Sequence, residues 1–395
     1  MSTHSENVST KMLLLSLASN IFTLQLPNIV SGLLLIEMAN TYNKSLGVMG
    51  QLRTISSLTG IGVSLLLGFL SVKYRHKSLL LTGMTLVIIS STGFLLSSTF
   101  TMIMIFYGIL GIGSSIIGPM NNTILGQYIS EEKRTFSFGL INGAAALAYL
   151  VGSPTIAYIS DLGGWQLPYR IFIIPLLLVS LLLGIKAIPS GSSQNSLNKS
   201  KNSILVGYQS VLKNKSALAC LIGNMVSGSI WISHLTFSSS YIRTRFLLSK
   251  MFTSYTAFIG APLFIAGSLL CGRLVSLYGR KMVTVVACVP SGLLLFLYFN
   301  SGNVWLTLVL GFLAAFSNGV LLTASGSLIM EQVPEFRGTL MSFASAVGGL
   351  GGAFGVGVVG WLIVNYGFSA TGFYMIMSGV LSGIVYYFFV EEPIR

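Results

Sequence analysis

The residues of this 395-residue chain that could do chemistry are polar ones standing singly inside long apolar runs. A polar group in an apolar run is costly unless it is satisfied, so it marks a binding site, a proton pathway or a contact between helices. The chemistry open to such residues is noncovalent binding and proton transfer. The candidates for contacting a solute are Gln25, Asn28, Arg53, Asn142, Tyr149, His234 and Asn318.

Each candidate also has a structural alternative. An Asn or Gln in a membrane helix often hydrogen-bonds a neighbouring helix, and His234 could be a packing residue. Arg53 shares one helical face with Ser57 and Gly60, and it needs water, an anion or a carboxylate nearby. Glu37 is the nearest carboxylate in the sequence. The sequence therefore leaves two alternatives for Arg53, a structural pair with Glu37 and a solute site.

Glu37 and His234 are the candidates for carrying a proton. Histidine changes its charge near neutral pH without help from its surroundings. Glu37 could pair with Arg53 in one state and separate from it in another, releasing a proton when the pair forms. His234 has no such partner identifiable in the sequence, so we place Glu37 slightly ahead as a hypothesis.

The sequence lacks the residue sets of an enzyme. It has no Ser-His-acid arrangement, no phosphate-binding loop and no metal-ligand cluster, and its three cysteines show no CxxC spacing. We therefore expect no catalytic residue, no cofactor and no metal. The net charge of +13 would suit nucleic acid, but the basic residues lie in short loops between apolar runs. That placement argues against nucleic-acid binding.

The elements that must position the candidate residues are membrane-spanning helices. The chain is 53% hydrophobic and only 8% charged, whereas a soluble domain has about a quarter of its residues charged. A spanning helix uses about 20 residues, which leaves room for twelve. The predicted spans are 12–36, 46–71, 78–97, 102–128, 136–160, 169–187, 216–240, 254–277, 281–299, 304–330, 338–364 and 368–390.

The spans divide into two groups of six. We expect cytoplasmic tails over 1–11 and 391–395, six-helix bundles over 12–187 and 216–390, and a linker over 188–215. The linker is rich in Ser, Asn and Lys, which is typical of a flexible segment. The loops on the side of both termini hold most of the Lys and Arg residues. The positive-inside rule then predicts that both termini are cytoplasmic.

A basic loop occurs twice, about half a chain apart. Gly272-Arg-Leu-Val-Ser-Leu-Tyr-Gly-Arg-Lys281 joins the eighth and ninth spans, and Gly68-Phe-Leu-Ser-Val-Lys-Tyr-Arg-His-Lys77 joins the second and third. Pro334-Glu-Phe-Arg-Gly338 and Glu131-Glu-Lys-Arg134 keep nearly the same separation. Two features that repeat at one period indicate a duplicated unit. Two like halves in a bilayer are a common architecture of secondary transporters.

The Gly-x-Leu-x-x-x-x-Gly-Arg-Lys pattern between two membrane helices resembles the signature loop of the major facilitator superfamily. The resemblance implies an all-α membrane fold of twelve helices in two pseudo-symmetric six-helix bundles. It also assigns a role in conformational change to Gly68, Lys73, Arg75, Lys77, Gly272, Gly279, Arg280, Lys281 and Arg337. Both copies of the loop lack the family's Asp at the fifth position, where Val72 and Ser276 stand. The conformational contact attributed to that Asp is therefore in question.

Other family features are weak in this chain. Tyr107 stands where many members carry an Arg in the fourth helix, and the Gly-Pro motif of antiporters survives only as Gly152-Ser-Pro154. Members that export cationic drugs usually hold a carboxylate inside the membrane, but none of the nine Asp and Glu residues falls at mid-membrane. This balance of charges favours an anionic or neutral amphiphilic solute.

The resemblance implies a secondary transporter of the drug-efflux or general solute type. It would move a small organic solute across the cytoplasmic membrane by alternating access, and proton-coupled efflux is one version of that activity. A facilitator or uniporter is an alternative, as is a non-transporting membrane sensor on the same fold. The duplicated halves disfavour a channel. The expected partners are the lipid bilayer, the solute and, for coupled transport, H+, and we expect a monomer.

Overall fold

The computed structural model describes residues 10–129, 137, 140–141, 143–189 and 209–392, and these residues are almost entirely helical. The elements of the first half are α1 (Thr10–Leu33), α2 (Leu35–Thr41), α3 (Leu46–Lys73), α4 (His76–Leu96), α5 (Phe100–Tyr128), η1 (Ala148–Gly152), α7 (Ser153–Gly163), η2 (Tyr169–Ile173) and α8 (Ile174–Ala187). The elements of the second half are α10 (Lys215–Phe246), α11 (Lys250–Tyr278), α12 (Arg280–Asn300), α13 (Val304–Gln332), η4 (Pro334–Phe336), α14 (Arg337–Tyr366) and α15 (Phe368–Phe389).

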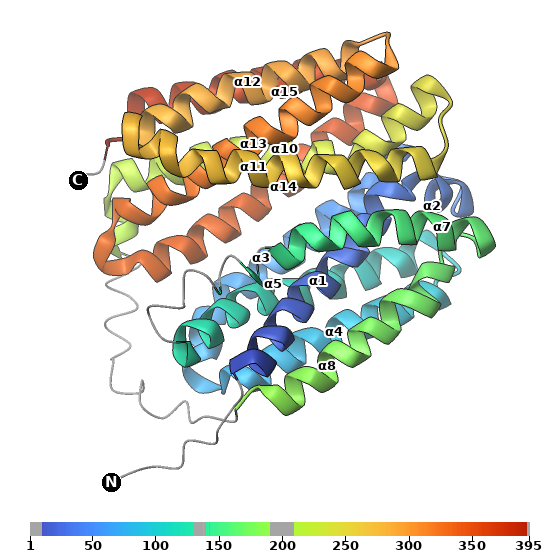
Figure 1. The fold of residues 1–395 in the computed structure, drawn as a ribbon, viewed down its shortest axis with the longest axis horizontal. Coiled ribbons are helices and arrows are strands. Elements are labelled where there is room, and N and C mark those ends of the chain that lie inside the picture. The colour runs from blue at the N-terminus through green and yellow to red at the C-terminus, as the bar shows by residue number, and fades with distance from the viewer. Residues whose placement is uncertain (1–9, 130–136, 138–139, 142, 190–208, 393–395) are drawn as a thin grey trace.

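The helices form two bundles, with α1 to α8 in one and α10 to α15 in the other (Figure 1). Eleven helices of the described chain are long and apolar enough to cross a membrane. The one remaining predicted span, 46–71, corresponds to α3. This helix has 28 residues and lies among the others, although it carries Arg53. The predicted all-α membrane fold is therefore confirmed. The predicted linker falls largely on residues 190–208, which lie outside the described part of the chain.

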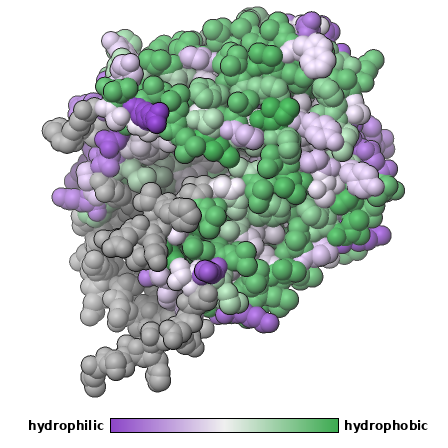
Figure 2. Space-filling view, in the orientation of Figure 1, coloured by the Kyte–Doolittle hydropathy of each residue, from purple (hydrophilic) through white to green (hydrophobic). Residues whose placement is uncertain are grey.

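Large apolar side chains cover the flanks of both bundles. Leu182 on α8, Val286 on α12 and Phe388 on α15 are 56%, 63% and 70% exposed. Figure 2 shows hydrophobic residues over the middle of the molecule and most hydrophilic ones toward its two ends. A soluble monomer rarely exposes apolar patches of this extent. The flanks therefore match the lipid that would surround them.

The two bundles start their helices in the same way, as a duplicated unit requires. The hydroxyl oxygens of Ser45 and Ser249 accept backbone N–H groups at the starts of α3 and α11, at 3.3 and 3.1 Å. Thr99 and Asn303 cap α5 and α13 in the corresponding places. Each cap satisfies a backbone donor that the helix itself leaves free.

Small residues allow corresponding helices to cross closely in both bundles. A Cβ atom on Gly111 of α5 would overlap the carbonyl oxygen of Ser56 on α3. In the second bundle, a Cβ atom on Gly319 of α13 would overlap the carbonyl oxygen of Phe264 on α11. Close backbone approach at small residues is the usual way in which membrane helices gain packing contacts.

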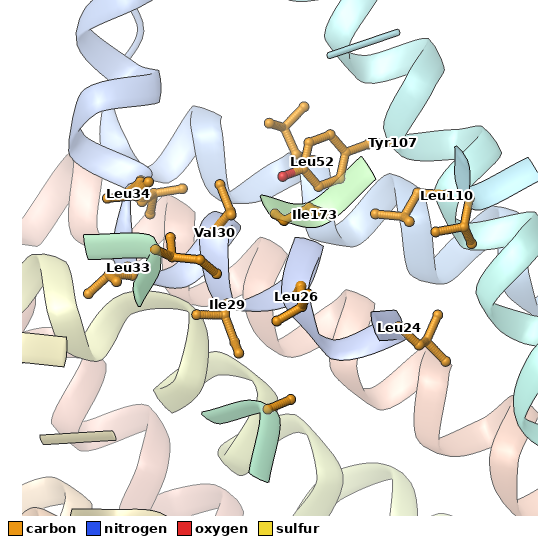
Figure 3. Packing of buried hydrophobic residues seen from close by; sticks show 14 of the residues in the cluster. Leu24, Leu26, Ile29, Val30, Leu33, Leu34, Leu52, Tyr107, Leu110 and Ile173 are labelled. Atoms are coloured by element: carbon orange, nitrogen blue, oxygen red, sulfur yellow. The ribbon is translucent and has the colours of Figure 1, made fainter. Parts of the chain in front are cut away.

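Helix α1 separates the core of the first bundle from the space between the bundles. Leu26 and Val30 are fully buried and lie on the side of Tyr107 and Ile173 (Figure 3). Ile29 and Leu33 extend to the opposite side of the chain in the same view. The two sides of this helix therefore serve different environments.

The two basic loops lie at the same end of the molecule, where α1 begins and α15 ends. We call this the termini end, and the opposite end, with α2 and the α10–α11 turn, the far end. In the first loop, Lys77 donates to the carbonyl of Ile185 at 2.7 Å, which ties α4 to the end of α8. The surroundings of Gly68 and Arg337 lie outside what the structure describes.

The second loop is held by a carboxylate from the end of the chain. Gly279 has a positive φ of 85°, a conformation that favours glycine. Beyond it, the backbone N–H groups of Arg280 and Lys281 donate to the two carboxylate oxygens of Glu392, at 2.8 and 2.7 Å. A carboxylate is stabilising at this position because it meets the free donors and the positive dipole of the α12 start.

We expect Glu392→Ala to destabilise the second bundle, because it leaves the two N–H groups at the start of α12 without this acceptor. Losing a helix cap typically costs about 1 kcal/mol. Thermal unfolding of the purified protein should therefore begin at a lower temperature in this variant. Glu391→Ala is the matched control, since the described hydrogen bonds of Glu391 use only its backbone. Equal melting of the two variants would contradict the capping role.

Candidate functional site

A cavity of about 760 Å³ lies between the two bundles. Its wall comes from α1, η1 and α7 of the first bundle and from α10, α11, α12 and α13 of the second. A cavity of this volume accommodates a drug-sized organic molecule. Its described lining includes hydroxyl, amide and aromatic side chains, but no Asp, Glu, Lys or Arg.

Four of the seven predicted solute-contacting residues line this cavity, namely Gln25, Asn28, Tyr149 and His234. Helix α1 presents Gln25, Asn28 and Gly32 together, because side chains three and four positions apart share a helical face. Asn142 lies outside the described residues, and Arg53 and Asn318 do not line the cavity.

Tyr149 reaches the cavity from a π-helical turn. Element η1 spans Ala148–Gly152, and Pro154 follows in the first turn of α7. Proline has no backbone N–H, so it cannot complete the regular hydrogen-bond ladder with the preceding turn. A π turn is one way for a helix to pass such a position, and π turns occur frequently at functional sites. Element η2 precedes Pro175 in the same way.

Arg53 lies directly behind the cavity wall. Its Nε donates to Ser31 Oγ at 3.1 Å and its Nη1 to Thr236 Oγ1 at 3.0 Å. Its Nη2 donates to the carbonyl oxygen of Asn28 at 2.9 Å. Neutral oxygens from α1 and α10 therefore hold the guanidinium, and among the described residues no carboxylate pairs with it.

Asn318 is fully buried within the second bundle. Its Nδ2 donates to the carbonyl oxygen of Ala314, one turn earlier in α13, at 2.9 Å. Its Oδ1 has no hydrogen-bond partner among the described residues. The depth of Asn318 in the span, which led to its selection, does not bring its side chain to the cavity.

One wall of the cavity carries four rings in a row, which we call the aromatic row: Phe264, Trp231, His234 and Tyr298. Phe264 and His234 both stack on Trp231, with ring centroids 5.5 and 5.6 Å away and interplanar angles of 18° and 28°. Tyr298 meets His234 edge to face at 5.1 Å. The row comes from three helices, α11, α10 and α12.

The sequence reasoning did not select Phe264 and Tyr298. The chain has 24 Phe and 16 Tyr residues, and rings in apolar helices are usually core or lipid-facing residues. Sequence reasoning did not select Trp231 either, although this residue lies three positions before His234. Spacing within α10 could have suggested that pair, but no local signal marks the partners from α11 and α12.

Two ion pairs join the bundles at the far end, and together we call them the far-end clamp. Arg243 on α10 donates from Nη2 to Glu37 Oε1 at 2.6 Å and from Nη1 to Glu37 Oε2 at 2.9 Å. Lys250 on α11 contacts Asp161 on α7 at 2.9 Å. The Glu37 and Arg243 side chains are only 21% and 13% exposed. In this structure Glu37 does not pair with Arg53, because Arg243 occupies both carboxylate oxygens.

On the side of the clamp that faces the termini end, α3 of the first bundle and α14 of the second approach each other. A Cβ atom on Gly47 would overlap the carbonyl oxygen of Gly360. Farther along, Thr54 Oγ1 donates to the carbonyl oxygen of Ala353 at 3.2 Å. Glycines of α14 also face α10, where Gly351 lies against the Met225 backbone. The glycine-dense helix therefore packs closely on both of its neighbours.

The family model described as "Major Facilitator Superfamily" matches residues 13–267 and 239–395 of the chain. The chain is similar to the cis,cis-muconate transport protein of Acinetobacter baylyi, with 23% identity over 309 residues covering 73% of this chain and 71% of the relative. It is similar to multidrug resistance protein D of Escherichia coli, with 23% identity over 321 residues covering 80% and 79%.

Solved structures show the same fold. A D-xylose-proton symporter superposes with a TM-score of 0.80 at 15% identity, covering 97% of this chain and 98% of that one. The nucleoside transporter NupG superposes with a TM-score of 0.78 at 17% identity, covering 96% and 99%. These similarities point to a membrane transporter and not to an enzyme. The chain belongs to the major facilitator superfamily.

Proposed function

We propose that this protein transports a small, neutral amphiphilic organic solute by alternating access, with the central cavity as its binding site. The observation that carries the proposal is the cavity of about 760 Å³ between two bundles that are joined at the far end by the clamp. Rocking of one bundle against the other would break the clamp and expose the cavity to the opposite side.

The termini end is proposed to face the cytoplasm. Lys73, Arg75, Lys77, Arg280 and Lys281 gather there, which follows the positive-inside rule. With that orientation the clamp closes the outer side, so the structure represents a state closed to the exterior. We expect a monomer, because one chain supplies every described wall of the cavity.

The charge of the solute follows from the lining. A charged solute in a low-dielectric cavity needs an opposite charge, and the described lining offers none. An anionic solute is the second candidate, and Arg53 is the observation that favours it. The guanidinium donates to the carbonyl of Asn28, a lining residue, at 2.9 Å. A relative named for cis,cis-muconate transport supports the same candidate.

Efflux is the direction that we favour, supported by the name of the multidrug resistance relative. For coupling to protons, we propose His234 ahead of Glu37, which reverses the order reached from the sequence. His234 lines the cavity, where its charge would be felt by the solute. Glu37 accepts two hydrogen bonds from Arg243. Its place in the clamp therefore accounts for this carboxylate without a role in proton transfer. The alternatives are an uncoupled facilitator and a non-transporting sensor.

A library of neutral, anionic and cationic amphiphiles should separate the solute classes. We expect neutral members to raise the thermal unfolding temperature of the purified protein most, because the described lining carries no formal charge. The best stabiliser should then show counterflow in proteoliposomes. Stabilisation mainly by anions, abolished by Arg53→Gln, would favour the second candidate. Stabilisation without counterflow would indicate a sensor and overturn the proposed transport.

Removing the clamp should open the far end. Thr256 lines the cavity, so Thr256→Cys can report access to it from outside cells through a membrane-impermeant maleimide. We expect Arg243→Ala to raise the labelling rate of that cysteine about tenfold, the effect of about 1.4 kcal/mol on a two-state equilibrium. Arg245→Ala is the control, since it removes the same charge from an exposed position on the same helix. Equal rates in both variants would show that the clamp does not hold this state.

Proton coupling can be tested with an imposed pH gradient across proteoliposomes. We expect His234→Gln to abolish gradient-driven accumulation of the solute while leaving counterflow, because exchange needs no net proton movement. Glu37→Gln should keep the accumulation. If His234→Gln accumulates solute as the parent does, His234 does not carry the proton. If the parent ignores the gradient, the protein is a facilitator or is driven by another ion.

A further inference from the structure

The aromatic row lines the cavity on the side of the second bundle. The rings of Phe264 and Trp231 are nearly parallel, with an interplanar angle of 18°, and the His234 ring is tilted from Trp231 by only 28°. Flat π-systems attract one another beyond the burial of their area, in offset-stacked or edge-to-face arrangements. A puckered saturated ring of the same size cannot make these contacts. Contacts with the aromatic row would therefore favour a flat solute over a saturated one.

Two polar groups beside this wall have unused hydrogen-bonding capacity. The Gln25 amide lines the cavity and makes no hydrogen bond to another described residue. His234 is 7% exposed, and its Nδ1 has no hydrogen-bond partner among the described residues. The Gln25 amide can therefore donate to and accept from a polar group of a solute in the cavity.

We propose that the cavity selects flat, conjugated solutes that carry a neutral hydrogen-bonding group. In this arrangement Trp231, supported by Phe264, favours planarity, and Gln25 binds the polar group. The inference rests on the proposed function in taking the cavity as the solute site, and it adds the shape and bond type of the solute. Tyr149 adds a ring from the first bundle.

The test compares 2-naphthamide with decahydro-2-naphthamide, measured by equilibrium dialysis against the purified protein. The two amides share the polar group and differ in planarity and π electrons. Burial of apolar area alone favours the saturated amide, so a preference for the flat one reports the aromatic row. We expect the parent to bind 2-naphthamide about three- to tenfold more tightly than the saturated amide, the usual range for one aromatic pair.

Variants separate the two parts of the proposal. Trp231→Leu should bring the affinity ratio of the two amides close to one, and Trp231→Phe should keep most of the preference. Gln25→Leu should weaken both amides by a similar factor and leave their ratio unchanged. Trp361→Leu is the control, because Trp361 lies on α14 with 57% of its surface exposed. Thermal unfolding of each variant shows whether it is folded.

Equal binding of both amides by the parent, or binding of neither, overturns the proposal. So does an equal loss of both amides in a folded Trp231→Leu protein, because Trp231 would then only fill space. The proposed function fails separately. If the flat amide binds selectively but shows no counterflow in proteoliposomes, selection of flat solutes stands and transport does not.

Discussion

A guanidinium inside an apolar helix bundle has to be surrounded by oxygen atoms, and at Arg53 this requirement ties the cavity wall to both halves of the molecule. Its three described bonds reach Ser31 and Asn28 on α1 and Thr236 on α10. The segment of α1 that lines the cavity is therefore held from behind by a charge on α3. Since Thr236 belongs to the second bundle, separation of the bundles would leave the guanidinium short of one acceptor. The Arg53 guanidinium thus both supports the wall of the central cavity and contributes to the contact between the bundles.

The hydrogen bonds within each bundle differ from those between bundles. Asn20, Asn121 and Ser180 form a fully buried network inside the first bundle, with distances of 2.8 to 3.1 Å. Such bonds make a bundle behave as a rigid body. The interbundle bonds whose partners are both described lie toward the far end, from the clamp down to Thr54 and its acceptor Ala353. Within the described part of the chain, two rigid halves joined in this way are suited to rocking.

The sequence predicted the fold well because each membrane helix satisfies its own backbone, so its hydrophobic run is readable without knowledge of its neighbours. It also selected Gln25, Asn28, Tyr149 and His234, since polar residues in apolar runs are few. It could not give the rotation of each helix, and for that reason Asn318 was selected although it bonds its own helix. Closeness along the chain suggested Arg53 as a partner for Glu37, whereas its partner in this structure, Arg243, comes from the other half.

The π turn η1 has a consequence for how such a cavity can change over evolutionary time. A π turn holds one residue more than an α turn, so it takes up an inserted residue that would rotate one side of a regular α-helix by about 100°. Deleting a single residue near Tyr149 would convert the turn to regular helix and aim a different side chain at the solute. The ends of the span, and with them the contacts at the membrane surfaces, would stay nearly in place. A chain with this feature can exchange the lining of its cavity through a shift of register, without any substitution in the lining itself.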